Sequence, residues 1–521
     1  MLLCDGASSK PKTDPAAPDA AGSCDDKMDY LLCPDYNGLK GHHGDFFTDW
    51  IDDVTRRFCR HYKYPCTLSN KWLLFLCISA IMWRRLEKYL SEWKETIGRL
   101  PLLVRGARQV GKSYTIEAFG RAHFQNVVVI NFELYPHFKP CFQGLDPKEI
   151  LAKIQLLLGV DIHEGVLLFL DEIQECPSAI MALRYFKEQM PQIPVIGAGS
   201  LLEFAMRSEH FTMPVGRVGF LYMEPLSFSE FLAASGHDAL NTYLAEVTLE
   251  HPVDIAVHEK LLSLLRTYFI LGGMPAVVSE YLSSGNIMQC QQIQTALLQA
   301  YRSDFGKYAA TVQQKYLQRV FDTSFRFVGQ RVKYSHIDSE MKSRDLKQAL
   351  QLLALAGIIR PIYASHASGV PLGADLQERK LKLNVLDIGL MQNACGLQSA
   401  LAVEQNFLQI NAGALAEQFV GQELRAYADP RRSAELYFWA RDQKSSTAEV
   451  DYVTNVDAFI VPIEVKSGKR GTLRSLQLFL AEKPASLGVR IAQTPLSYHE
   501  RILSIPLYLI AQLPRLVAMC R

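Results

Sequence analysis

Residues 102–113 read LLVRGARQVGKS, and this stretch decides how the first half of the chain is expected to fold. The mostly apolar residues 102–105 predict a short buried strand, and the residues from Lys112 onward predict a helix. Between them lies the pattern G-x-x-x-x-G-K-S, whose glycines let backbone N–H groups converge on a phosphate at a helix N-terminus. The residues predicted to bind a nucleotide are Gly106, Ala107, Arg108, Gln109, Val110, Gly111, Lys112 and Ser113.

The last two residues of this loop have distinct predicted roles. Lys112 is expected to reach the β- and γ-phosphates of ATP, and the Ser113 hydroxyl is expected to ligand Mg²⁺. The alternative interpretation is a glycine-rich turn between a strand and a helix that contains an incidental lysine.

A second stretch, VLLFLDE at residues 166–172, favours the nucleotide site. Its length and apolar composition predict a buried parallel strand that ends in two acids. Asp171 is then expected to complete the Mg²⁺ shell, and Glu172 to polarise the attacking water. The alternative is an ordinary core strand capped by solvated acids.

Strands and helices alternate along this part of the chain. The expected strands cover 127–132, 166–171 and 194–200, and the expected helices cover 147–158 and 177–189. The alternation predicts an α/β fold, the doubly wound parallel sheet of a P-loop NTPase, with the ligand at the carboxyl ends of the strands.

Three further residues are candidates for sensing or neutralising the γ-phosphate. Ser200 ends a predicted strand, so it is a candidate sensor, although a simple turn serine would look the same. Arg207 and Arg217 are candidates for a charge-neutralising arginine, although most arginines are surface residues.

Composition excludes several classes of protein. The net charge of +1 over 521 residues shows no overall basic excess, so a contact with DNA or RNA has to use a local patch. Eleven cysteines without paired spacing indicate reduced thiols and a cytoplasmic location. The longest apolar run, residues 72–83, is too short to span a bilayer.

The remaining domain predictions follow changes in pattern. Residues 1–81 are expected to be a poorly structured extension, and their cysteines and histidines lack the spacing of a metal site. Residues 82–240 carry the ATPase pattern, and 241–314 read as a helical lid or linker. Residues 315–395 suggest a winged-helix segment, with helices at 315–328 and 343–356 followed by strands at 358–363 and 380–385.

Residues 396–521 contain a second group of candidate catalytic residues. Glu464 and Lys466 are two apart in a predicted strand and therefore share a face, and Asp451 can lie alongside on the neighbouring strand. Glu417 lies on a predicted helix at 412–428. Asp451 and Glu464 could hold Mg²⁺ for attack on a phosphodiester, with Lys466 beside them, whereas a structural ion-pair cluster would have the same sequence.

These motifs together resemble a known family. Residues 82–480 are similar to prokaryotic AAA-type ATPases whose C-terminal half is a winged-helix plus PD-(D/E)xK nuclease-like domain. The matching segments are 106–113, 170–174, 199–200, 216–218, 225–231, 272–275, 356–359, 386–390, 449–451 and 463–468. The resemblance implies ATP binding and hydrolysis. Ser113 stands where threonine is common in the family, and residues 1–80 have no counterpart.

Two functional hypotheses remain open. In the first, an AAA-type ATPase uses its nucleotide state to move domains, and its C-terminal domain acts on DNA or RNA. In the second, the chain is a nucleotide-controlled switch that binds a protein partner and has no nuclease chemistry. Assembly into an oligomer is compatible with both. A phosphotransferase is disfavoured, because Glu172 next to Asp171 suits water activation.

Overall fold

The computed structural model describes residues 82–205, 216–309, 311–398, 413–442, 446–466 and 472–521. These residues belong to one compact unit, which spans residues 66–521. The extension predicted for residues 1–81, with its cysteines and histidines, lies outside the described residues, and so does Arg207.

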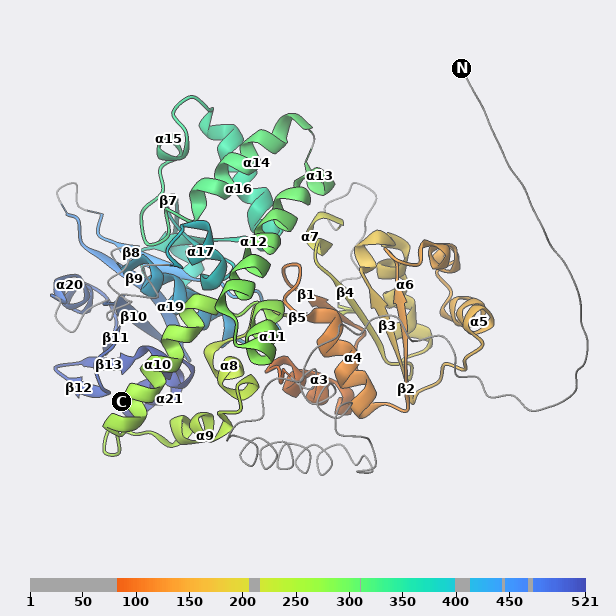
Figure 1. The fold of residues 1–521 in the computed structure, drawn as a ribbon, viewed down its shortest axis with the longest axis horizontal. Coiled ribbons are helices and arrows are strands. Elements are labelled where there is room, and N and C mark those ends of the chain that lie inside the picture. Colours follow the sequence, from red (N-terminus) through yellow and green to blue (C-terminus); the bar gives the residue numbers. More distant parts are fainter. Residues whose placement is uncertain (1–81, 206–215, 310, 399–412, 443–445, 467–471) are drawn as a thin grey trace, which may run out of the picture. The chain divides into compact units, whose positions relative to one another are not determined.

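The first sheet has five parallel strands in the order β2-β3-β4-β1-β5 (Figure 1). The strands are β1 (Leu102–Arg105), β2 (Asn126–Asn131), β3 (Val166–Asp171), β4 (Val195–Gly199) and β5 (Gly219–Tyr222). This arrangement confirms the predicted parallel α/β sheet. The central strands are buried over their whole length, as the apolar runs in the sequence predicted.

Alternate residues of β3 pack on opposite faces of this sheet. Leu167 and Phe169 belong to one apolar cluster with residues of α4 (Lys112–His123), on the face that α3 (Leu86–Glu95) also joins. Leu168 and Leu170 belong to a second cluster with α5 (Pro147–Leu158) and α6 (Pro177–Gln189). Helices therefore cover both faces of the sheet. A ligand site is expected at the remaining open edge, where the strands have their carboxyl ends.

A mostly helical region follows the first sheet. Its α-helices are α8 (Phe228–Ala234), α9 (Asp238–Glu246), α10 (Ile255–Leu271), α11 (Pro275–Ser284), α12 (Ile287–Ser303), α13 (Phe305–Tyr308), α14 (Thr311–Ser324), α15 (Tyr334–Ile337) and α16 (Ser343–Leu355). Helix α8 begins with a capping box, in which Ser227 and Glu230 exchange hydrogen bonds with each other's backbone N–H.

The second sheet has eight strands in the order β12-β13-β11-β10-β9-β8-β6-β7. Its strands are β6 (Ile359–Ser365), β7 (Leu376–Val385), β8 (Tyr437–Ala440), β9 (Glu449–Val456), β10 (Phe459–Val465), β11 (Gly488–Ala492), β12 (Ser497–His499) and β13 (Ile502–Pro506). The helices of this part are α17 (Ile388–Ala394), α19 (Ala414–Ala426), α20 (Arg474–Glu482) and α21 (Leu513–Met519).

This sheet contains strands from both sides of the expected boundary at residues 395/396. The hairpin of β6 and β7, which the sequence suggested as the wing of a separate winged helix, pairs through β6 with β8. The β6–β8 pairing is parallel, so the hairpin extends the sheet of the last segment. The predicted winged-helix and nuclease-like segments therefore share one sheet.

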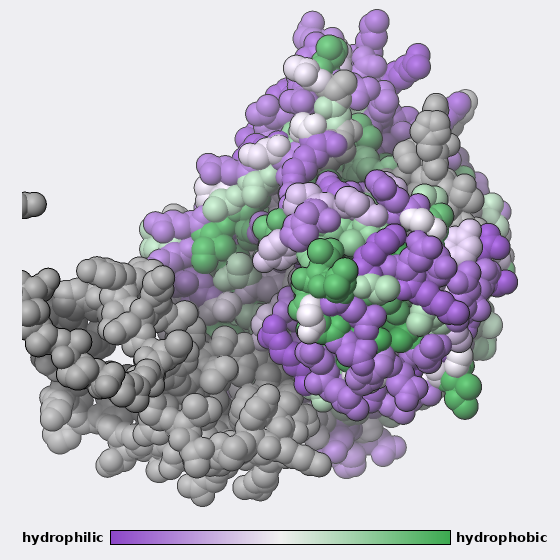
Figure 2. Space-filling view, turned by 90° about the vertical axis from the view of Figure 1, so that its right-hand side faces the viewer, coloured by the Kyte–Doolittle hydropathy of each residue, from purple (hydrophilic) through white to green (hydrophobic). Residues whose placement is uncertain are grey.

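The surface around the first sheet is mostly hydrophilic with small apolar groups. Figure 2 looks onto the side of Figure 1 that carries α5, and apolar residues gather there in patches among polar ones. Leu156, Leu157 and Leu158 at the end of α5 are exposed. Within the described residues no single helix is long and apolar enough to cross a membrane, while α10 and α11 pass that test only as a pair bent by 120°.

Candidate nucleotide-binding site and carboxylate cluster

The predicted phosphate loop has the backbone geometry that its glycines allow. Gly106 and Gly111 have φ angles of 153° and 96°, in the region that side-chain-bearing residues rarely adopt. A Cβ on Gly106 would lie 2.3 Å from the Met223 carbonyl oxygen, so only glycine fits beside β5. Helix α4 begins at Lys112, directly after Gly111.

Lys112 lies buried at the centre of this loop. Its Nζ donates to the carbonyl oxygens of Gly106 (3.1 Å) and Ala107 (2.8 Å). Burial lowers the pKa of Lys112 to about 8, although the nearby acids Glu172 and Asp171 act in the opposite direction. The loop therefore encloses a single ammonium group, the group expected to pair with phosphate oxygens.

Asp171 links the phosphate loop to the neighbouring strands. The Ser113 hydroxyl donates to Asp171 Oδ1 at 2.9 Å, and the Asn131 amide donates to Asp171 Oδ2 at 2.8 Å. The pairing of Asn131 with Asp171 in β2 and β3 brings these residues to one sheet edge. The Ser113 hydroxyl and the Asp171 carboxylate are hard oxygen ligands, so they fit Mg²⁺.

Two further predicted residues lie at the same sheet edge. Glu172 follows β3 in the left-handed region with φ 47°, and its Oε2 accepts a hydrogen bond from Gln174 Nε2 at 2.5 Å. Ser200 follows β4, between β3 and β1, and is buried. Among the described residues its hydroxyl has no hydrogen-bond partner. A buried hydroxyl without a partner at this edge is suited to a ligand oxygen.

Arg217 lies away from the other residues predicted to contact the nucleotide. Gly219 pairs with Leu102, so Arg217 precedes the amino end of β5, at the sheet edge opposite the phosphate loop. Its half-exposed guanidinium pairs with Glu188, with Nε 3.1 Å from Oε1. The parallel register therefore prevents Arg217 from reaching phosphates bound to the same chain.

The phosphate loop is also contacted from the helical region. Arg108 Nη1 lies 2.6 Å from Asp304 Oδ1, at the junction of α12 and α13, and the Tyr301 hydroxyl donates to the Arg108 carbonyl oxygen at 2.8 Å. Nearby, Lys307 Nζ pairs with Glu133 Oε1 at 3.0 Å. The loop that would bind phosphates is thus tied to α12 and α13 by hydrogen bonds and ion pairs.

The predicted carboxylate cluster of the second sheet assembles around a lysine. The Lys382 ammonium from β7 is almost completely buried and lies near Glu417 Oε2 (2.8 Å), Glu449 Oε1 (3.1 Å) and Asp451 Oδ1 (3.4 Å). Burial alone would lower the pKa of Lys382, but the three carboxylates raise it well above its ordinary value. Burial also raises the pKa of Glu417 to about 8.

Glu464 and Lys466 pair beside this cluster, and Asp451 is held next to them. Lys466 Nζ lies 2.5 Å from Glu464 Oε1, and the Val465 N–H donates to Asp451 Oδ2 at 2.8 Å. Burial and the charge of Asp451 together raise the pKa of Glu464 to about 7, although Lys466 acts in the opposite direction.

Two lysines lie against the acids predicted to bind a metal, Lys382 beside Asp451 and Lys466 beside Glu464. Lys382 Nζ lies between the carboxylates of Glu417, Glu449 and Asp451. Within the part of the chain that the structure describes, no group of three or more histidine, cysteine or acidic side chains is arranged to hold a metal ion. The ammonium group neutralises these acids instead.

Sequence reasoning did not identify Asn131, Asp304 or Lys382 as site residues. Asn131 could have been found, because it ends a strand as Asp171 does. Lys382 alternates with buried Leu381 and Leu383, which suggested only an amphipathic strand. Asp304 reaches Arg108 across almost two hundred residues, and no local pattern encodes that contact.

Three segments of the chain match models of known protein families. Residues 98–232 match a family model described as an AAA domain, residues 262–401 match a domain of unknown function (DUF8612), and residues 412–509 match another (DUF4143). No curated protein matches the chain.

Several solved structures are similar to part of the chain. The Walker-type ATPase PABY2304 of Pyrococcus abyssi is 15% identical with a TM-score of 0.39, and the match covers 60% of this chain and 96% of that one. The ORC2 protein of Aeropyrum pernix is 12% identical with a TM-score of 0.32, covering 61% and 93%. The RuvB Holliday junction branch migration motor of Thermotoga maritima is 14% identical with a TM-score of 0.25, covering 53% and 87%.

The family match and the loop geometry agree on the first part of the chain. Residues 98–232 form an AAA-type P-loop ATPase domain, and two domains of unknown function follow it.

Proposed function

We propose that this chain binds and hydrolyses ATP and uses its nucleotide state to move the helical region relative to the phosphate loop. The observation that carries the proposal is that Lys112, Ser113, Asp171 and Glu172 meet at one edge of a parallel sheet. This is the set of groups that phosphoryl transfer to water requires: an ammonium, a hydroxyl and a carboxylate for the metal, and a second carboxylate for the water.

Each group has a defined task in this proposal. Lys112 gives up its two carbonyl contacts and pairs with the β- and γ-phosphate oxygens. Ser113 and Asp171 hold Mg²⁺, which neutralises the phosphate charge when it is bound. Glu172 orients the attacking water, and the Ser200 hydroxyl donates to a γ-phosphate oxygen. The ties from Arg108 to Asp304 and Tyr301 carry a change in the loop to α12 and α13.

The first prediction tests nucleotide binding. Lys112→Ala removes the ammonium that faces the phosphates, so the affinity for Mg·ATP should fall at least 100-fold in a calorimetric titration. The control is Arg121→Ala, which changes an exposed cation on the same helix and should keep the wild-type affinity. Equal affinities of Lys112→Ala and Arg121→Ala would contradict the assignment of the phosphate loop.

For the C-terminal part, the lysine-centred cluster favours a nucleotide-controlled interaction switch over metal-dependent cleavage of nucleic acid. The supporting observation is that the acids a nuclease would use for a metal already face lysines, Asp451 facing Lys382 and Glu464 facing Lys466. Such a switch would bind a partner in one nucleotide state and release it in the other.

The second prediction concerns Lys382. Lys382→Met leaves three carboxylates without their buried cation, and breaking a buried ion pair costs roughly 3–5 kcal/mol. We therefore expect a clearly lower unfolding temperature than for Lys380→Met, the control on the same strand that loses only a more exposed pair with Asp442. Cleavage of DNA or RNA by the wild type with Mg²⁺ or Mn²⁺, abolished in both Asp451→Ala and Glu464→Ala, would instead support the nuclease hypothesis.

A further inference from the structure

Arg84 contacts the phosphate loop from a segment that precedes the matched ATPase domain. It lies two residues before the start of α3, upstream of residue 98, and its side chain is almost completely buried. Its Nη1 donates to the carbonyl oxygen of Val110 at 2.7 Å. Val110 is the residue before Gly111, so the contact is made inside the G-x-x-x-x-G-K-S pattern itself.

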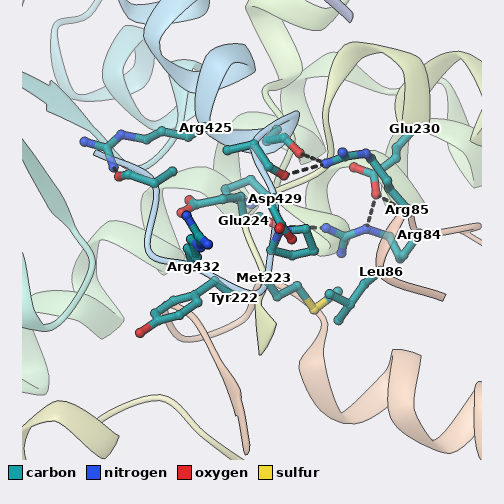
Figure 3. Close-up of a pocket in the computed structure, with 15 residues that line it drawn as sticks. Arg84, Arg85, Leu86, Tyr222, Met223, Glu224, Glu230, Arg425, Asp429 and Arg432 are labelled. Atoms are coloured by element: carbon teal, nitrogen blue, oxygen red, sulfur yellow. Dashed lines mark hydrogen bonds and ion pairs between the residues drawn. The ribbon is translucent and has the colours of Figure 1, made fainter. Parts of the chain in front are cut away.

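Two other groups fix the guanidinium of Arg84. Its Nη2 donates to the Glu224 carbonyl oxygen at 2.6 Å, and its Nε donates to Glu230 Oε1 at 3.1 Å. Figure 3 shows the side chains of Arg84 and Glu230 pointing toward each other. A guanidinium held in three directions has one orientation, which a lysine could not reproduce.

Glu230 is itself held in place. Its Oε2 accepts from the Ser227 N–H at 2.8 Å as part of the capping box of α8, and its Oε1 also accepts from the Arg85 N–H at 2.8 Å. The cavity beside these residues has a volume of about 40 Å³, which is room for a few water molecules. The three hydrogen bonds of the Arg84 guanidinium are all made to protein groups, to Val110, Glu224 and Glu230.

The contact with Val110 has a geometric consequence for phosphate binding. The peptide between Val110 and Gly111 is planar and trans, so its C=O and its N–H point in opposite directions. Holding the Val110 carbonyl toward Arg84 turns the Gly111 N–H the other way. Backbone N–H groups of this loop are the donors that surround a bound phosphate.

We propose that Arg84 is a positioning residue for ATP binding, which orients the 110–111 peptide of the phosphate loop. This inference rests on the proposed ATP binding. It does not make Arg84 a catalytic residue, because Arg84 acts through the backbone of Val110 and not on the phosphate. It also extends the functional ATPase unit to the segment before α3.

The test removes the contact without leaving a charge unpaired. The variant is Arg84→Met combined with Glu230→Gln in the full chain, and Mg·ATP affinity and steady-state hydrolysis are measured. Glu230→Gln alone is the first control, because it keeps Arg84 on Val110. Arg85→Met is the second, because Arg85 donates to the carbonyl oxygens of Ala426 and Ala428 and does not touch the loop.

The double variant should raise the Kd and KM for ATP at least tenfold over Glu230→Gln, with kcat at saturating ATP within threefold. Arg85→Met should keep a Kd within threefold of the wild type. Arg84→Lys, which can still donate to Val110, should give an intermediate Kd. A purely structural role would lower the unfolding temperature of the folded variants without this change in Kd.

Equal affinities of the double variant and Glu230→Gln would overturn the positioning role and leave the ATPase proposal intact. If the double variant does not fold, Arg84→Lys decides: a Kd raised over that of Arg85→Met supports the role, and an equal Kd overturns it. Wild-type protein that binds no ATP would overturn both proposals, so the two failures are distinguishable.

Discussion

At the scale of single residues, Asp171 sets the chemistry of the site. Its two carboxylate oxygens accept from different elements, Oδ1 from Ser113 on α4 and Oδ2 from Asn131 on β2. Both contacts orient the carboxylate toward the phosphate loop. Glu172 comes next in the chain, but its left-handed backbone directs it differently, and its Oε2 is held by Gln174. The two adjacent acids thus have different partners, because the strand ends between them.

This separation predicts how Glu172→Gln behaves. The amide keeps the size of the side chain but cannot polarise water, so hydrolysis should slow by about 10²–10⁴. ATP affinity should remain within a few-fold of the wild type, because Lys112, Ser113 and Asp171 are unchanged. Phosphate release and equilibrium binding measured on the same sample check both statements. Turnover within a few-fold of the wild type would show that another group activates the water.

At the scale of elements, α19 connects the two halves of the described structure. Near its start, Glu417 lies 2.8 Å from Lys382 in the carboxylate cluster. Further along, Glu423 accepts from the Phe228 N–H, at 3.1 Å from each carboxylate oxygen, at the first residue of α8. Helix α8 carries Glu230, which holds Arg84. One buried helix therefore contacts both the cluster and the support of the phosphate loop.

Glu423, which makes the contact between α19 and α8, is expected to make the stability of the folded chain depend on pH. Burial raises its pKa to about 8 from an ordinary 4.5. Between pH 4.5 and 8 the folded chain holds a proton that the unfolded chain lacks, so this group lowers stability as pH rises, by up to about 1.4 kcal/mol per pH unit. The fall in unfolding temperature from pH 5.5 to 8 should therefore be smaller in Glu423→Gln than in the wild type.

The control for this measurement is Glu149→Gln, an exposed glutamate on α5. It should leave the pH dependence of the unfolding temperature unchanged. An identical pH dependence in Glu423→Gln and Glu149→Gln would mean that Glu423 is ionised in the folded chain.

At the scale of the whole molecule, the phosphate loop touches distant parts of the described chain. Besides Asp304 and Tyr301, Gly357 lies so close to Ala107 that a Cβ on Gly357 would be 3.4 Å from the Ala107 Cβ. Pro275, at the start of α11, lies equally close to Gly111. A Cβ built on Gly111 would be 3.3 Å from the Pro275 Cγ. A change in the loop on nucleotide binding would therefore press on the junction of α12 and α13, on the start of α11 and on the turn before β6.

Asp304→Asn tests whether a change in the phosphate loop reaches α12 and α13 through Arg108. It removes the charge facing Arg108 but keeps the side-chain shape, so ATP binding should persist within a few-fold. The ATP-induced change in amide exchange over α12 and α13 should shrink at least twofold. Asp322→Asn, which breaks an exposed pair with Arg302 on α12, is the control and should leave that change intact. The same response in both variants would contradict a route through Arg108.

The sequence predicted the parallel sheet, because its strands are apolar runs and the phosphate loop is one continuous segment. It also placed Asp171 and Ser200 correctly at strand ends. It could not predict that β6 and β7 join the second sheet, since that pairing depends on Tyr363 meeting Tyr437, far along the chain. Lys382 is likewise distant in the chain from Asp451, Glu464 and Lys466, so the sequence did not predict that its ammonium group lies among the C-terminal acids.

The measurement that tests the central claim most directly is steady-state phosphate release by the full chain at saturating Mg·ATP, in the wild type, Lys112→Ala and Arg121→Ala. We predict steady release by the wild type and Arg121→Ala, and release at the buffer background by Lys112→Ala. Release by Lys112→Ala at the wild-type rate, or none from the wild type, would contradict ATP hydrolysis at this loop.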